Sequence, residues 1–147
     1  MKKFLLLLPL LLVITCLTAF ARLNTPVDPR AEQAFKKEFA GAANVIWSKA
    51  GEFLRVSFTW ADHQTVAYFN ADAELVGCIR GLFFNQLPLT VIRSVEKQFK
   101  NSIVLEIREI TNDEGVNYTL VAEYKDKKYK IRLNSLGDLL AKEKLKQ

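Results

Sequence analysis

The feature that most constrains the fold is a series of short segments in which apolar and polar residues alternate, separated by turn residues. One of them runs from Phe53 to Trp60 and has apolar residues at every second position: Leu54, Val56, Phe58 and Trp60. A period of two indicates a β-strand with one face on a core and one toward solvent. Such runs start about every 8 to 12 residues, which predicts an antiparallel meander.

Two segments with a helical period precede two groups of these strands. Asp28 and Pro29 supply an N-cap and a first-turn proline, which predicts a helix from about Pro29 to Ala40. Pro88 fits the first turn of a second helix with an apolar stripe: Leu89, Ile92, Val95 and Phe99. The expected strands are 45–49, 53–60, 65–69, 74–84, 103–110, 116–124 and 129–133. Residues 136–147 form either a short fourth strand or a terminal helix.

The two groups resemble one unit used twice. Residues 67–76 align with 131–140, sixty-four residues on, and four additional residues fit a longer turn at 112–115. Apolar positions of the helices correspond at a spacing of sixty: Phe35 and Phe39 with Val95 and Phe99. The similarity predicts an internal repeat.

These patterns predict an α+β fold. Two repeats of a helix plus an antiparallel meander, at about 29–84 and 88–147, are expected to share one sheet or core. A segment of about sixty residues buries too little of its surface to be stable alone. Residues 22–147 are therefore expected to behave as one domain.

The N-terminus has the pattern of a secretory signal peptide. Lys2 and Lys3 precede a mostly apolar run from Phe4 to Leu17, which leads to Ala19-Phe20-Ala21. This predicts export, with residues 1–21 removed by cleavage near Ala21. The run is shorter than the roughly 20 apolar residues that a membrane span needs, so no stable span is expected after cleavage. The expected location is periplasmic or secreted.

Cleavage changes the cysteine content and the charge. Cys16 lies where a lipidated cysteine could sit, although Thr15 stands where a small residue is required, so lipidation remains open. Without residues 1–21 the chain has 126 residues, a formal charge of +3 and only Cys78, so it forms no intramolecular disulfide. Cys78 lies in an apolar run and is interpreted as buried. The weak and scattered positive charge argues against a nucleic-acid partner.

The sequence supplies little catalytic or metal-binding chemistry. His63 is the one histidine and falls in a turn, where solvation is expected, and no nucleophile, phosphate-loop or metalloprotease motif occurs. Two acidic pairs lie at turns and supply too few oxygen ligands for calcium: Asp72 with Glu74, and Asp113 with Glu114. The interpretation is a non-enzymatic chain with no catalytic residue, no metal and no cofactor.

One stretch resembles a known family. The run F-A-G-A-A-N-V-I-W at residues 39–47, followed by 66–70 and 72–76, is similar to the PepSY-like, beta-lactamase-inhibitor-like family of exported bacterial proteins. The similarity covers about 32–140, although the second repeat has Ser102-Ile103-Val104-Leu105 and no tryptophan at the corresponding place. It implies a tandem helix-plus-four-strand fold whose open sheet face binds a protein or peptide, and it implies no catalytic residue.

Candidate binding residues follow from the alternation. A sheet face without a helix would present a polar set: Arg55, Glu106, Arg108, Glu123, Lys130 and Arg132. Phe83 and Phe84 are adjacent and face opposite ways on a strand, so one is expected to be exposed or packed between the halves. The basic segment 125–132 is interpreted as a solvated, aggregation-guarding edge, or alternatively as an electrostatic footprint for an acidic partner or the envelope surface.

Together these features predict an exported, non-enzymatic and inhibitor-like module. Its open sheet face would bind an unidentified protein or peptide in the cell envelope. The alternative is a structural or accessory cell-envelope protein that acts as an oligomer, and light scattering on the cleaved chain separates the two.

Overall fold

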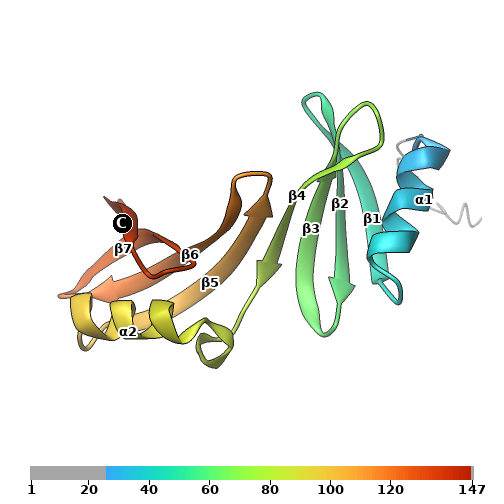
Figure 1. The fold of residues 1–147 in the computed structure, drawn as a ribbon. Coiled ribbons are helices and arrows are strands. Elements are labelled where there is room, and N and C mark those ends of the chain that lie inside the picture. Colours follow the sequence, from blue (N-terminus) through green and yellow to red (C-terminus); the bar gives the residue numbers. More distant parts are fainter. Residues whose placement is uncertain (1–25, 147) are drawn as a thin grey trace, which may run out of the picture.

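The computed structural model describes residues 26–146. The first half contains α1 (Pro29–Glu38), β1 (Ala43–Ala50), β2 (Phe53–Trp60), β3 (His63–Phe69) and β4 (Leu75–Gly81). The second half contains the 3-10 helix η1 (Phe84–Gln86), α2 (Leu89–Gln98), β5 (Ile103–Asn112), β6 (Gly115–Tyr124), β7 (Lys127–Asn134) and β8 (Leu139–Lys144) (Figure 1). The predicted signal peptide, its cleavage site and Cys16 lie outside the described residues.

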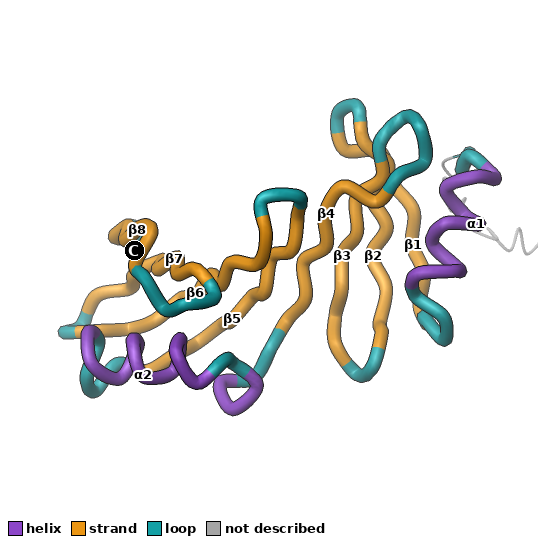
Figure 2. The backbone as a smooth tube through the Cα atoms, viewed as in Figure 1, coloured by secondary structure: helices purple, strands orange, loops and turns teal. Residues whose placement is uncertain are grey.

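All eight strands form one antiparallel sheet in the order β1 to β8 (Figure 2). The halves join where β4 pairs with β5, from Gly77 opposite Asn112 to Gly81 opposite Arg108. In Figure 1 the strands of the two halves run at an angle to each other, so the sheet bends at this junction. The predicted α+β class, with two helices and a shared antiparallel sheet, is confirmed.

The first core lies between α1 and β1–β3. The Asp28 carboxylate accepts a hydrogen bond from the Arg30 backbone N–H at 2.8 Å and caps α1. Phe35 and Phe39 then point at the sheet, and their ring centroids lie 4.8 and 4.7 Å from that of Phe58. Interlocked aromatic rings therefore attach this helix to the sheet.

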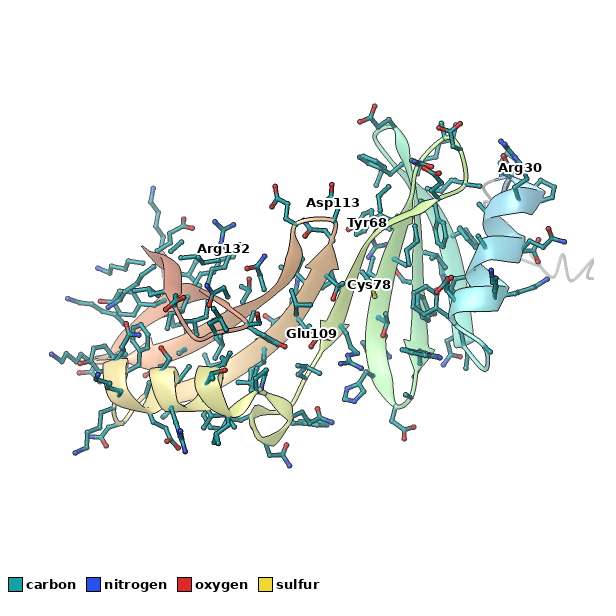
Figure 3. The ribbon with its side chains drawn as sticks, viewed as in Figure 1. Arg30, Tyr68, Cys78, Glu109, Asp113 and Arg132 are labelled. Carbon is teal, nitrogen blue, oxygen red and sulfur yellow. The ribbon has the colours of Figure 1, made fainter. Side chains whose placement is uncertain are left out.

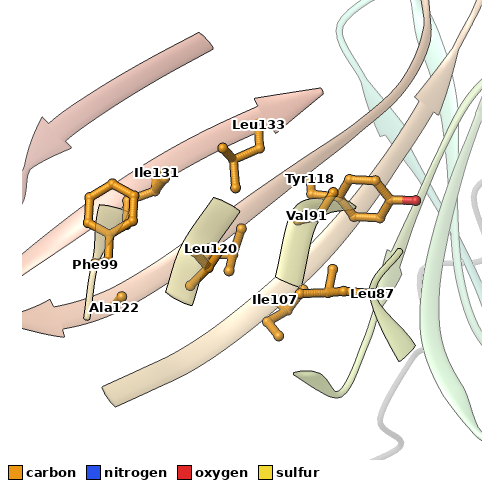
Figure 4. Close-up of a cluster of buried hydrophobic side chains, with 10 residues drawn as sticks. Leu87, Val91, Phe99, Ile107, Tyr118, Leu120, Ala122, Ile131 and Leu133 are labelled. Carbon is orange, nitrogen blue, oxygen red and sulfur yellow. The ribbon is translucent and has the colours of Figure 1, made fainter. Parts of the chain in front are cut away.

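The second core lies between α2 and β5–β7. The helix contributes Val91 and Val95, and Phe99 follows at its C-cap. The strands contribute Leu120 and Ile131, and all five are at most 3% exposed (Figure 4). The apolar stripe expected from Leu89, Ile92, Val95 and Phe99 is shifted: Leu89 is 59% exposed, and Val91 takes its place in the core.

Strand register shows that both helices cover the same sheet face. Val56 pairs with Ala67, Ala67 with Cys78, Cys78 with Thr111, and Thr111 with Val116. Directly opposed residues share a face. Val56 belongs to the first core and Val116 packs against the second, so this row connects the two helix-covered regions.

Most strands agree with the sequence-based expectation, two details differ, and one open alternative is decided. β4 ends at Gly81 instead of reaching Phe84, because residues 84–86 turn into a 3-10 helix. The four additional residues lengthen β5 and β6 to ten residues each, against eight in β1 and β2, and leave a two-residue turn. The C-terminal alternatives are decided in favour of a strand, β8.

Equivalent turns in the two halves have the same hydrogen bonds. The Asn70 side-chain carbonyl accepts from the backbone N–H groups two and four residues on, at 3.0 and 2.9 Å. Asn134, sixty-four residues later, makes the same two bonds at 3.0 and 2.9 Å. Each asparagine side-chain N–H also donates to a carboxylate at 2.9 Å: Asn70 to Glu74, and Asn134 to Asp138. Asparagine turn chemistry therefore accounts for the acidic residues that follow.

Candidate binding surface

The second face of the sheet, here called the open face, carries no helix within residues 26–146. One row across it is Ser57, Val66, Ile79, Ile110 and Asn117, each opposite the next on neighbouring strands. The row passes through the junction of β4 and β5 without interruption. No helix covers these side chains, and all five are half-buried.

A groove of about 670 Å³ lies on the open face where the two halves meet. Its lining from the first half includes Arg55, Ser57, Val66, Tyr68, Ile79 and Gly81. Its lining from the second half includes Leu105, Glu106 and Arg108, and the segment between the halves adds Phe83. The groove is therefore built from both halves and combines apolar, aromatic and charged side chains.

Glycine contributes to the depth of the groove. Gly77, Ile79 and Gly81 occupy alternate positions of β4 on the open face, and Gly81 is the glycine that lines the groove. A Cβ atom added at Gly81 would lie 3.7 Å from the Gln64 carbonyl oxygen, which is an ordinary contact. The absent side chain thus leaves open space, and the backbone at Gly81 does not require glycine.

The six polar residues expected on an uncovered face all lie on the open face, in two groups. Arg55 is opposite Tyr68, and Arg108 is opposite Gly81; with Glu106 they line the groove. The remaining three lie farther along β6 and β7, outside the groove: Glu123, Lys130 and Arg132. Figure 3 labels Tyr68 in the first half and Arg132 in the second.

The charged residues of the groove differ in their partners. Arg108 donates to Glu106 in an ion pair along β5. Arg55 is half-buried and forms no ion pair with any other described residue. Its guanidinium can therefore donate hydrogen bonds to a carboxylate of a partner without first breaking a salt bridge.

Phe83 and Phe84 lie in different surroundings, although neither is on a strand, because β4 ends at Gly81 and Phe84 begins η1. Phe83 is 70% exposed and lines the groove, whereas Phe84 packs against the second core. Phenylalanine is one of the aromatic residues enriched in protein interfaces, so Phe83 is a candidate contact for a protein partner.

His63 is not the solvated turn residue that the sequence suggested. It is half-buried, it begins β3, and its ring centroid lies 6.2 Å from that of Phe83. The Gln86 side-chain carbonyl accepts from the Phe83 backbone N–H at 2.8 Å, and its amide nitrogen lies 3.2 Å from His63 Nε2. These contacts tie the β2–β3 turn to the segment that carries Phe83.

Several groove residues were missed from the sequence. Tyr68 and Gly81 carried no signal, because only the pairing of β3, β4 and β5 brings them beside Arg55 and Arg108. Leu105 is 51% exposed because the register of β5 shifts between Val104 and Glu106. A bulge of this kind changes which face a side chain meets, and simple alternation does not reveal it.

On the helix-covered face, a polar cluster lies between the two cores. Arg80 donates to Glu109 at 2.8 Å, and the Tyr118 hydroxyl donates to the same carboxylate at 3.1 Å. Burial, with a further contribution from Glu109, raises the pKa of the Tyr118 phenol. The cluster joins β4, β5 and β6 on the face away from the groove.

Cys78 lies beside that cluster and is partly buried. Its burial raises the pKa of the thiol, an effect that Arg80 opposes and Glu109 reinforces. Since the thiolate is the reactive form, less of it is present at pH 8 than for an ordinary cysteine. Iodoacetamide should therefore alkylate Cys78 about tenfold or more slowly than N-acetylcysteine at pH 8, and unfolding in urea should remove the difference. Equal rates for the folded chain and N-acetylcysteine would contradict this placement.

Other site types were considered over the described part of the chain. Residues 26–146 contain no group of three or more His, Cys, Asp or Glu side chains positioned to hold a metal ion. The same residues include no helix long and apolar enough to cross a membrane.

The sheet order, the two helices on one face and the open second face define the beta-lactamase-inhibitor-like fold. A solved BLIP-like protein from Bacteroides fragilis superposes on this chain with a TM-score of 0.73 at 19% identity, covering 83% of this chain and 89% of that one. A candidate periplasmic protein from Bacteroides eggerthii gives 0.73 at 19% identity, covering 81% and 89%. A DUF2874 family protein from Bacteroides uniformis gives 0.73 at 15% identity, covering 81% and 90%.

The similarity to these proteins is a similarity of fold. No family model matches the sequence, and no curated protein matches it. The likeness to the beta-lactamase-inhibitor-like fold, expected from residues 39–47 and the segments that follow, is confirmed. The PepSY part of that resemblance stays a prediction.

Proposed function

We propose that this chain is an exported, non-enzymatic module that binds a protein or peptide in the cell envelope through the open face. The observation that carries the proposal is the groove at the junction of the halves, with exposed Phe83 and Leu105 beside it. Large exposed apolar side chains gathered at one place on a surface are typical of interaction sites. The candidate periplasmic neighbour supports the location, and the BLIP-like neighbour supports a protein as the partner.

The lining suggests which chemistry the groove recognises. Val66, Tyr68 and Ile79 form an apolar strip, and Arg55 stands at its side without an ion-pair partner among residues 26–146. An exposed loop or extended peptide with an apolar side chain next to a carboxylate fits this arrangement. The apolar side chain would enter the groove and the carboxylate would meet Arg55.

Filling the groove tests the proposal. Gly81→Val adds a side chain that points into the groove, and the backbone there tolerates it. The variant should retain at least tenfold less of the partner that wild type specifically captures from an envelope extract, a difference of about 1.4 kcal/mol. The chain from Arg22 would be immobilised, and captured protein quantified by mass spectrometry.

Gly77→Val is the matched control. It adds the same side chain on the same face of the same strand, where the nearest atom is the Thr111 carbonyl oxygen at 3.6 Å, and it lies outside the groove. It should capture the partner as wild type does. Unchanged capture by Gly81→Val, or equal losses in both variants, would count against the groove as the binding site.

Inhibition is the form of binding that the name BLIP-like suggests. If the captured partner is an enzyme, wild-type chain should slow its turnover in a concentration-dependent manner, and Gly81→Val should require about tenfold more protein for the same effect. A partner whose activity is unchanged at saturation would leave a binding module that does not inhibit.

A further inference from the structure

The positive charge is not scattered, as the sequence suggested, but is concentrated at one end of the second half. Three segments meet there: 96–103, 123–130 and 142–146. Ile103 is opposite Glu123, Glu123 is opposite Lys128, and the Lys128 carbonyl accepts from the Leu145 backbone N–H at 2.9 Å. These segments, here called the lysine end, contain nine lysines and four carboxylates, a formal charge of +5, whereas the rest of residues 26–146 carries −3.

The lysines of this end are available to a partner. All nine are exposed: Lys97, Lys100, Lys125, Lys127, Lys128, Lys130, Lys142, Lys144 and Lys146. None of them forms an ion pair with another residue of the described chain. In Figure 3 long side chains with nitrogen at their tips project from this end of the second half. The charge of this end is therefore not compensated internally.

Aromatic rings pack beneath one lysine of the lysine end. The ammonium group of Lys142 lies 4.4 Å from the ring centroid of Tyr129, 5.1 Å from that of Phe99 and 5.6 Å from that of Tyr124. These cation–π contacts hold β8 against the end of α2 and keep the three segments together. Close by, Ile103 is 62% exposed. The surface thus combines lysines, tyrosines and one protruding aliphatic side chain.

We propose that the lysine end binds the surface of an anionic phospholipid membrane. Clustered lysines are attracted to acidic headgroups, tyrosines favour the membrane interface, and a single exposed isoleucine can enter the headgroup region. The expected export brings the chain to membranes and away from nucleic acids, which favours lipid as the polyanion. The inference rests on charge complementarity and on that expected export, and not on the groove.

Vesicle sedimentation tests the inference with no protein partner present. The chain from Arg22, which retains every described residue, would be mixed with vesicles of phosphatidylcholine alone or with one third phosphatidylglycerol. It should sediment with the mixed vesicles only, and binding should fall as salt rises. The triple variant Lys127→Gln, Lys128→Gln and Lys146→Gln should bind at least tenfold more weakly, since each lysine near an anionic surface contributes roughly 1 kcal/mol.

A second triple variant removes the same amount of charge elsewhere. It shows whether vesicle binding depends on the lysine end or only on the net charge of the chain. This control variant removes three exposed lysines from the first half: Lys36→Gln, Lys37→Gln and Lys49→Gln. This variant should bind mixed vesicles within about twofold of wild type, because the screening length of roughly 8 Å isolates distant charges. Equal weakening in both triple variants, or no sedimentation with mixed vesicles, would overturn the inference. So would binding to an acidic polypeptide or to DNA without binding to the vesicles.

Discussion

Phe58→Ala is expected to lower the free energy of unfolding by about 3 to 5 kcal/mol. Phe58 is 1% exposed and touches Phe35 of α1 and Phe39 at the end of that helix, so its removal leaves a cavity between helix and sheet. The change would be measured by urea denaturation, followed by tryptophan fluorescence and circular dichroism. A loss of this size is a large part of the stability of a domain of this length.

Phe53→Ala is the matched control for that experiment. Phe53 is the same residue type on the same strand, but it lies on the open face and is half-buried. Its replacement should cost about 1 kcal/mol, the central value for single substitutions, because it leaves no cavity in the core. Similar losses for the two variants would mean that the helix-covered face has been assigned wrongly.

Gly137→Ala should have the second-largest effect, a loss of about 2 to 4 kcal/mol. Gly137 has a φ of 88°, and a Cβ atom there would lie 2.5 Å from the Thr90 carbonyl oxygen. The left-handed conformation alone costs alanine about 1 to 2 kcal/mol, and the collision with the backbone of α2 adds to it. The Thr90 hydroxyl also donates to the Ser135 carbonyl at 2.8 Å, so the helix cannot move away without losing that bond.

The corresponding position of the first half supplies the comparison. Ala73 has a φ of 64° and aligns with Gly137. Ala73→Gly should change the free energy of unfolding by less than about 1 kcal/mol, because relief of backbone strain is offset by the greater freedom of glycine in the unfolded chain. Urea denaturation of both variants measures the difference. A tolerated Gly137→Ala would show that the turn and α2 are less tightly packed than described.

The fold was predictable because local patterns and tertiary packing agree. In β2 the residues expected against a helix, such as Val56 and Phe58, are the ones buried under α1. Asp28 and Pro29 likewise mark the start of α1. β8 was ambiguous because all six of its residues are exposed, so burial imposes no period on its sequence.

The groove was only partly predictable, for a different reason. Alternation within single strands identified Arg55 and Arg108 as open-face residues. Their meeting around one groove depends on the β4–β5 pairing, which is a contact between distant parts of the chain. The exposure of Leu105 depends on a bulge, and the contribution of Gly81 depends on its lack of a side chain. Neither feature produces an apolar or charged pattern in the sequence.

The most direct test of the central claim, that the open face binds a partner, is photo-crosslinking from two positions. A benzophenone-bearing phenylalanine analogue would replace Tyr68 in the groove or Gln33, which is exposed on α1. Illumination of cells should give a discrete crosslinked protein from position 68 and none from position 33. The same adduct from position 33, or an adduct from position 33 alone, would contradict binding through the open face.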